Sequence, residues 1–219
     1  MNLEDIKNTV FLLGMRYSNI RISPEQFNHY LKQANIELFK QLYGFVKEQS
    51  GWEVSNQVKD SLRHFKTADT SLSLDVNGRA SYPADYFHQD DLKSVVGSNV
   101  YKVTVVSSNK SSEIRADSIY FPTSTYPICE LNDTYIQFYP VDLTGVYMTY
   151  LRYPTEPEYV TEYDTNKGIN VYDSNNSTEL EWGDEHYIDI IRIILGYMDI
   201  AVGTGEIAQL MDIKQDKES

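Results

Sequence analysis

The stretch SLSLDVNGRASY, residues 71–82, marks the point at which the hydrophobic pattern of this chain changes. Leu72, Leu74 and Val76 alternate with polar residues, and this alternation is typical of a half-buried strand. Asn77-Gly78 then favours a tight hairpin turn, because both turn residues would take a positive φ. The alternation resumes after the turn. The stretch therefore predicts a first β-hairpin and separates a helical part of the chain from a β part.

Helical spacing precedes this stretch in three segments. Ser23 predicts an N-cap, Pro24 the first helical position, and Gln26 the second half of a capping box. Gly14 predicts the end of the first helix. We expect the apolar stripes to be buried in the protein's own core, which is the usual fate of an amphipathic helix; a groove for a partner is the alternative. The stripes consist of Leu3, Ile6, Val10 and Leu13, of Phe27, Leu31, Ala34, Leu38, Leu42 and Phe45, and of Val54, Val58, Leu62 and Phe65.

Short alternating segments follow the stretch and predict further strands. Asn132-Asp133 predicts a hairpin between two of them. No helix-length pattern lies between these segments, so parallel βαβ units are disfavoured. We expect an antiparallel β-sheet or a small sandwich. The expected strands are Tyr101–Val106, Ile114–Phe121, Ile128–Leu131, Tyr135–Tyr139 and Val146–Tyr153.

The remaining sequence predicts an exposed insertion and a closing helix. Residues 155–180 are polar, with a short hairpin around 169–172. An amphipathic C-terminal helix is expected from about Asp184 to Val202, with Gly203 and Gly205 interrupting it. The predicted fold class is α+β. Its parts are a helical segment (1–69), an antiparallel β core with the insertion and the closing helix (70–203), and a tail (204–219).

Composition and charge exclude several classes of function. The 219 residues include 32 acidic and 19 basic side chains, a formal net charge of −13. Such a chain repels polyanions, so we expect no sequence-specific binding of nucleic acid. Cys129 is the only cysteine, which allows no internal disulfide and no Cys-rich zinc site. The most apolar stretch, Tyr187 to Val202, is too short and too charged to span a bilayer, so no membrane is expected.

Residues that could carry catalysis form no recognisable pattern, and we expect neither an enzyme nor a cofactor or metal site. The sequence around His88, Asp90 and Asp91 is interpreted as a solvated loop rather than a cation site. His186 and Asp189 lie one helical turn apart and are interpreted as a structural pair rather than a catalytic dyad. The acidic residues before the closing helix are expected to complement its dipole. They are Glu179, Glu181, Asp184 and Glu185.

Tyrosine is abundant, with 18 copies against 8 Phe and 2 Trp. Its ring buries a large area while the hydroxyl stays polar, which suits surfaces that become interfaces. Antiparallel strands also favour tyrosine. A carbohydrate-binding platform would use the same side chains, so this feature alone does not choose between the functions.

Several short motifs in a fixed order resemble the head–tail connector proteins (adaptor or ring proteins) of short-tailed phages, particularly the crAss-like phages of gut Bacteroides. The resemblance covers most of the chain, in the order of its short motifs and in the general character of the sequence between them. The insertion at 155–180 departs from smaller members of the family. The motifs are Tyr82-Pro83-Ala84-Asp85-Tyr86, Tyr139-Pro140, Tyr150-Leu151-Arg152-Tyr153-Pro154, and Glu181-Trp182 followed by an Ile-rich helix.

The resemblance implies a virion structural protein, made in the host bacterial cytoplasm, that forms a ring of about twelve copies beneath the portal through head-to-tail contacts. DNA would pass through the ring, and no cofactor is implied. Twelve copies would carry roughly −156 formal charges, which would keep DNA from adhering to the channel. The resemblance makes the tail a candidate surface for portal or neighbouring ring proteins, through Ile207, Leu210, Met211 and Ile213.

Three other functions remain open from the sequence. A tail-tube or tail-hub subunit of the same virus is the nearest alternative. A carbohydrate-binding or adhesion module would use the tyrosines and the β core. A glycoside-active enzyme would need two carboxylates that converge in a cleft.

Overall fold

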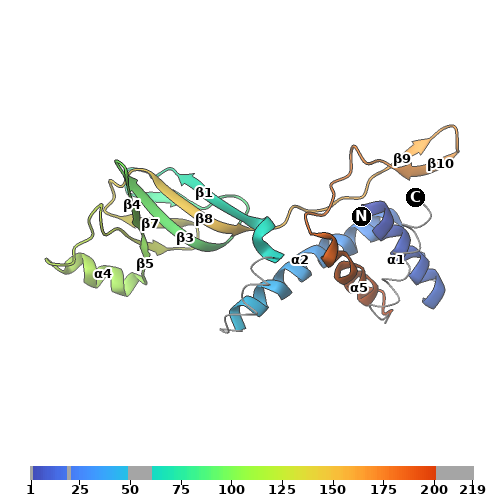
Figure 1. The fold of residues 1–219 in the computed structure, drawn as a ribbon, viewed down its shortest axis with the longest axis horizontal. Coiled ribbons are helices and arrows are strands. Elements are labelled where there is room, and N and C mark those ends of the chain that lie inside the picture. Colours follow the sequence, from blue (N-terminus) through green and yellow to red (C-terminus); the bar gives the residue numbers. More distant parts are fainter. Residues whose placement is uncertain (1, 19–20, 49–60, 201–219) are drawn as a thin grey trace. The chain divides into compact units, whose positions relative to one another are not determined.

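A computed structural model describes residues 2–18, 21–48 and 61–200. The chain is an α+β protein, as the sequence predicts, and divides into two compact units (Figure 1). The β unit is residues 65–153, and the helical unit comprises the parts of the chain before and after it. The closing helix packs against the N-terminal helices. This division therefore differs from the sequence-based boundaries, which grouped that helix with the β core.

The β unit is a small sandwich of two four-stranded sheets. One sheet has the strand order β1-β8-β3-β4, and the other has the order β2-β7-β6-β5. Side chains of both sheets form one buried cluster that includes Leu92, Met148, Ile136 and Phe138. The strands are β1 (Lys66–Leu72), β2 (Arg79–Ser81), β3 (Tyr86–Val96), β4 (Asn99–Lys102), β5 (Thr104–Val105), β6 (Ile128–Leu131), β7 (Tyr135–Tyr139) and β8 (Val146–Arg152).

The chain passes from one sheet to the other at two corners. Strand β4 runs into β5 through the buried Val103, whose N–H donates to the carbonyl of Leu92 at 2.8 Å. Strand β1 is joined to β2 by the turn at 75–79, where the N–H of Asp75 donates to the carbonyl of Arg79. Both corners lie at sheet edges. The covalent connections therefore cover part of what would otherwise be open edges.

The turn at Asn77-Gly78 is not the predicted hairpin. β1 pairs with β8 and β2 pairs with β7, so the strands flanking the turn belong to different sheets. Gly78 has a φ of +73°, as expected, but Asn77 does not have a positive φ. The Asp75 carboxylate accepts hydrogen bonds from the N–H groups of Asn77 and Arg79 and fixes the turn instead.

The other strand predictions have mixed outcomes. β6 and β7 begin and end as predicted, and they form the expected hairpin at 132–133. The strand predicted at Ile114–Phe121 is wrong, because helix α4 (Ser108–Ala116) occupies most of that segment. The supposed loop around His88, Asp90 and Asp91 is also wrong, since these residues lie in β3.

A parallel pair contradicts the expectation of a purely antiparallel β part. β5 and β6 run parallel, with Thr104 opposite Ile128, and α4 lies in the connection between them. Only one residue of this nine-residue helix, Ser111, is buried. Its sequence therefore carries no apolar stripe by which it could be recognised.

The helical unit is built on α1 (Leu3–Ser18), α2 (Pro24–Glu48) and α5 (Tyr187–Tyr197), the last preceded by a 3₁₀ turn at Asp184–His186. The predicted capping box is confirmed: the N–H of Gln26 donates to Ser23 Oγ at 3.2 Å and the N–H of Ser23 donates to Gln26 Oε1 at 3.0 Å. The stripes on α1 and α2 are buried at Leu3, Ile6, Val10, Leu13, Phe27, Leu31, Ala34 and Leu38, as predicted. No described helix is long and apolar enough to cross a membrane.

Two predicted helix ends are corrected. α1 continues past Gly14 to Ser18. α5 ends at Tyr197 rather than near Val202, because Asp199 takes a φ of +57°. The N–H of Ile200 then donates to the carbonyl of Leu195 at 3.0 Å, which is the hydrogen bond of a Schellman motif. Most of the third predicted helix lies outside the described residues; of its stripe, Leu62 and Phe65 are buried.

Two asparagines of α2 hold the chain that returns from the β unit. Asn28 bonds the N–H and the carbonyl of Tyr159, and the buried Asn35 donates to the carbonyl of Thr155 at 3.0 Å. The indole N–H of Trp182 donates to Asn35 Oδ1 at 2.6 Å. Because the asparagines are seven residues apart, two helical turns, they project from one face of α2.

The insertion contains the predicted hairpin, formed by β9 (Thr161–Asp164) and β10 (Ile169–Tyr172). Two acidic residues that follow it do not serve the closing helix, which corrects the prediction. Glu179 accepts from the N–H of Leu3 at 2.9 Å, so it stabilises the beginning of α1, and Glu181 accepts from the N–H of Thr155.

Candidate interaction surface

The tail residues predicted as an interface, Ile207, Leu210, Met211 and Ile213, lie outside the described residues. A different surface stands out in the β unit. It consists of α4, the loop 117–127 that follows it, and the adjoining ends of β4, β5 and β6. We call this the α4 surface. Figure 1 shows α4 on the outside of the β unit, close to β5.

A local cap begins α4, and a cation–π contact joins its other end to the unit. Ser107 is the N-cap, and its Oγ accepts from the N–H of Lys110 at 3.4 Å. Near the other end, the Arg115 guanidinium lies over the Tyr139 ring of β7, 4.4 Å from its centroid. The helix is therefore closed by a local cap at its beginning and contacts the unit through Arg115 near its end, without a buried apolar stripe.

The loop after α4 exposes large apolar side chains in a defined backbone. Asp117 ends the helix, and its Oδ1 accepts from the N–H groups of Ile119 and Tyr120 at 2.7 and 3.2 Å. Ile119 is 83% exposed and Tyr126 is 79% exposed. The intervening Pro122 is buried and anchors the loop. Because the carboxylate holds the turn, the apolar side chains stay in solvent rather than folding back.

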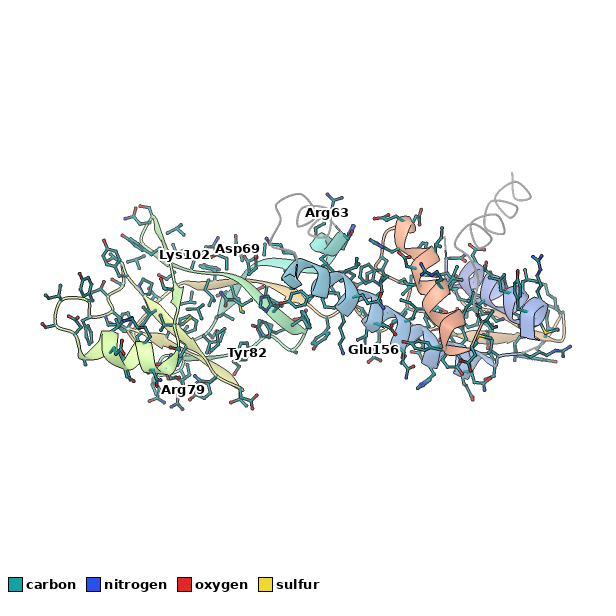
Figure 2. The ribbon with its side chains drawn as sticks, turned by 90° about the horizontal axis from the view of Figure 1, so that it is seen from below. Arg63, Asp69, Arg79, Tyr82, Lys102 and Glu156 are labelled. Carbon is teal, nitrogen blue, oxygen red and sulfur yellow. The ribbon has the colours of Figure 1, made fainter. Side chains whose placement is uncertain are left out.

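Figure 2 labels Lys102, on β4, among the strands that adjoin this surface. An open groove of about 540 Å³ lies between the helix, the loop and the strands. Tyrosines of the loop and apolar residues of the strands form the apolar part of its lining. Lysines and two carboxylates of the helix form the charged part. The side chains on which the argument depends are Lys102, Thr104, Lys110, Glu113, Tyr120 and Tyr126.

Lys102 differs from Lys110 in its surroundings. Lys110 pairs with Glu113 at 2.9 Å, whereas Lys102 makes no ion pair with the described part of the chain. Lys102 also lies directly opposite Lys93 on the neighbouring strand, and Lys93 pairs with Asp69 at 2.6 Å. Like charges in opposite strand positions repel each other. Lys102 is thus an exposed cation beside another cation, at the edge of an aromatic groove.

One histidine–carboxylate pair of the helical unit has a structural setting. His186 is buried, Nδ1 lies 3.8 Å from Asp189 Oδ2, and the ring packs edge-on against Trp182. This is the pair that the sequence predicts. No group of three or more His, Cys, Asp or Glu side chains in the described residues is arranged to hold a metal ion.

Burial sets the protonation of two groups of the β unit. It raises the pKa of the Cys129 thiol to about 12, with the nearby Glu130 charge adding to the effect. It also raises the pKa of Tyr82 to about 12, again with smaller contributions from neighbouring groups. The tyrosine hydroxyl is hydrogen-bonded to the carbonyl of Asn132 at 2.9 Å. Both groups are therefore protonated at neutral pH and serve the packing of the unit.

The sequence pattern does not predict the α4 surface. The strand predicted at Ile114–Phe121 covers the end of its helix and the run Ile119-Tyr120-Phe121 of its loop. The flanking Asp117 and Pro122 are turn-forming residues and were the available signal. No protein-family model matches this chain, and neither does any curated protein.

Proposed function

We propose that this protein is a structural subunit that forms a ring in a phage head–tail connector through which DNA passes. The observation that carries the proposal is the exposed apolar loop of the α4 surface. Monomeric proteins rarely keep several large apolar side chains together in solvent, and such patches mark sites of association. Asp117 fixes the turn in advance, so little further ordering is needed when a partner binds.

The distribution of charge also supports a conduit. The net charge of −13 gives every copy a field that repels DNA, and a ring multiplies that field. Double-stranded DNA would then move through the assembled channel without binding to its wall. The resemblance of the motif order to connector proteins makes the head–tail junction the expected position, and a tail-tube or tail-hub position is the alternative.

Native mass spectrometry and electron microscopy test the proposal. We expect the purified protein, alone or with portal, to give discrete ring-sized oligomers, and labelled copies to lie at the junction of head and tail. Ile119→Ser together with Phe121→Ser should shift the oligomers towards monomer. Val76→Ser, at a 94% exposed apolar residue away from the loop, is the matched control. A protein that stays monomeric with portal and is absent from assembled particles would refute the proposal.

A carbohydrate-binding module is the second candidate, because Tyr120 and Tyr126 line an open groove that also has polar side chains. Aromatic faces beside hydrogen-bonding groups suit sugar rings. Binding to immobilised glycans that is lost in Tyr126→Ala, in a protein that remains monomeric, would favour this function over the connector.

A further inference from the structure

We infer that Asn77 is a site of hydrolytic deamidation in this chain, and that the folded turn around Asp75 protects it. The co-reactant is water, and the products are ammonia and a chain with aspartate or isoaspartate at position 77. The inference does not depend on the proposed function, because it concerns the chemistry of a single backbone turn.

The sequence makes this one position reactive. Asn77 is the only asparagine of the chain that is followed by glycine. Because glycine has no Cβ, its backbone nitrogen is the least hindered nucleophile that can follow an asparagine. The Gly78 nitrogen can therefore reach Asn77 Cγ and form a five-membered imide ring, whereas the residue after every other asparagine carries a side chain that hinders this attack.

The reaction needs no reagent other than water. In the first step a bond forms between the Gly78 nitrogen and Asn77 Cγ, the bond from Cγ to Nδ2 breaks, and ammonia leaves with the proton of the Gly78 N–H. In the second step water opens the ring. Cleavage of the new bond to Cγ gives aspartate. Cleavage of the original peptide bond gives isoaspartate instead, in which the backbone runs through Cβ and Cγ.

The folded turn holds the nucleophile away from Cγ. The N–H of Gly78 donates to the carbonyl of Asp75 at 3.0 Å, which closes a turn over residues 75–78. Neither Val76 nor Asn77 has a positive φ, so the turn is of type I. The third residue of such a turn has a ψ of about 0°. The next backbone nitrogen then lies beside the residue's own nitrogen and away from its Cβ, so ring closure requires a rotation of the backbone.

Hydrogen bonds to β7 resist that rotation. The carbonyl of Asn77 accepts from Gln137 Nε2 at 2.7 Å. The carbonyl of Gly78 accepts from the N–H of Phe138 at 2.8 Å. Rotation about the bond between Cα and the carbonyl carbon of Asn77 would break at least the first of these bonds, and leaving such groups without partners is unfavourable.

The Asp75 carboxylate holds the other reactant. Its Oδ1 accepts from the N–H groups of Asn77 and Arg79 at 2.8 and 2.9 Å, and the Asn77 side chain bonds the same carboxylate. The N–H of Arg79 contributes most to a lowered pKa of Asp75, and the Asn77 side chain contributes as well. The carboxylate is therefore ionised at the mildly alkaline pH that favours imide formation, and it keeps the Asn77 amide engaged there.

The fold also determines which product it tolerates. Gly78 is buried, and a Cβ added to it would lie 2.7 Å from Val141 Cα. Isoaspartate lengthens the backbone by one methylene immediately before Gly78, so this residue could not keep both its packing and its bond to Phe138. Aspartate leaves the backbone length unchanged. Deamidation of a chain that has not yet folded would therefore damage the connection between the two sheets.

Peptide mapping by mass spectrometry tests the protection. The full chain is incubated at mildly alkaline pH, folded or in guanidinium chloride, and the loss of the Asn77 amide is followed. We expect the loss to be about tenfold or more slower in the folded protein, because ring closure then requires local opening of the turn. Equal rates in the two states would overturn the inference.

Variants of Asp75 test how the protection arises. Asp75→Ala should bring the rate in the folded protein close to that of the denatured chain. Asp75→Asn keeps an acceptor oxygen for both N–H groups and should keep most of the protection. Asp133→Ala, an exposed carboxylate in the hairpin at 132–133, is the matched control and should change nothing. Circular dichroism checks that each variant is folded, and a folded Asp75→Ala that deamidates at the unmodified rate would overturn the role of Asp75. If Asp75→Ala does not fold, Asp75→Asn and the comparison of the folded with the denatured chain still decide.

The stability of the two products gives a second readout. The isoaspartate form is made by incubating the denatured chain, separated by chromatography and refolded. We expect it to unfold at a lower urea concentration than Asn77→Asp, which has the same charge and an unaltered backbone length. Equal unfolding midpoints would show that the turn accepts the longer backbone and would overturn this part of the inference.

Discussion

Two glycines of the β unit, Gly78 and Gly97, both have a positive φ, but their surroundings differ. Gly78 has a φ of +73° and Gly97 a φ of +64°. A Cβ at Gly78 would lie 2.7 Å from Val141 Cα, whereas a Cβ at Gly97 would meet nothing within 4 Å. Gly97→Ala should cost about 1–2 kcal/mol for the left-handed backbone alone. Gly78→Ala should cost about 2–5 kcal/mol, because a backbone clash is added. Urea unfolding measures the free energy of unfolding of both variants. Equal decreases would show that the contact with Val141 does not constrain Gly78.

Cys129 should be unreactive in the folded protein. It is fully buried, and burial raises its pKa to about 12, so almost no thiolate exists at neutral pH. We expect a thiol reagent such as DTNB to label it only as fast as the β unit opens, and at once in concentrated guanidinium chloride. Ser98→Cys, at an exposed turn, is the control and should react immediately. Labelling of both cysteines at the same rate would show that the core around Cys129 is open.

At the scale of elements, the sequence predicted the strands that have an alternating hydrophobic pattern and the helix that begins with a capping box. The alternating runs of β6 and β7 and the capping box of α2 needed only neighbouring residues, and they were placed correctly. α4 was missed because it has no apolar stripe, only Ser111 among its residues being buried. The α4 surface could not be predicted, since it depends on β5 and β6 pairing in parallel across twenty-two intervening residues.

Asn35 shows how one residue can link elements that are distant in sequence. Asn35→Ala removes the acceptor of the Trp182 N–H and the donor to the Thr155 carbonyl. Leaving the buried Trp182 N–H without a partner should lower the free energy of unfolding by about 1–3 kcal/mol. The Thr155 carbonyl belongs to an exposed residue and can bond water, so it should add less. Gln41→Ala removes an exposed hydrogen bond to Glu37 and should cost less than about 0.5 kcal/mol. Urea unfolding followed by tryptophan fluorescence measures both, and a small effect at Asn35 would mean that water replaces its bonds.

At the scale of the whole molecule, the β unit is an insertion in a helical protein. Lys66 at its beginning pairs with Leu151 near its end, so the chain leaves and returns at adjacent positions. Its buried cluster is drawn entirely from residues within the unit. The helical unit likewise buries its stripes among α1, α2 and α5. Among the described residues each unit therefore has buried apolar side chains of its own, which is the main requirement for independent folding.

Separating the two units tests this independence. Residues 65–153, expressed alone, should give a β-type circular dichroism spectrum and one cooperative unfolding transition, because all eight strands and their core are retained. The full chain with these residues replaced by a short Gly/Ser linker should keep its helical spectrum, since the linker has only a short gap to span. If the isolated β unit is unfolded, the helical unit must contribute to its stability. The insertion and its host would then unfold together in one cooperative transition.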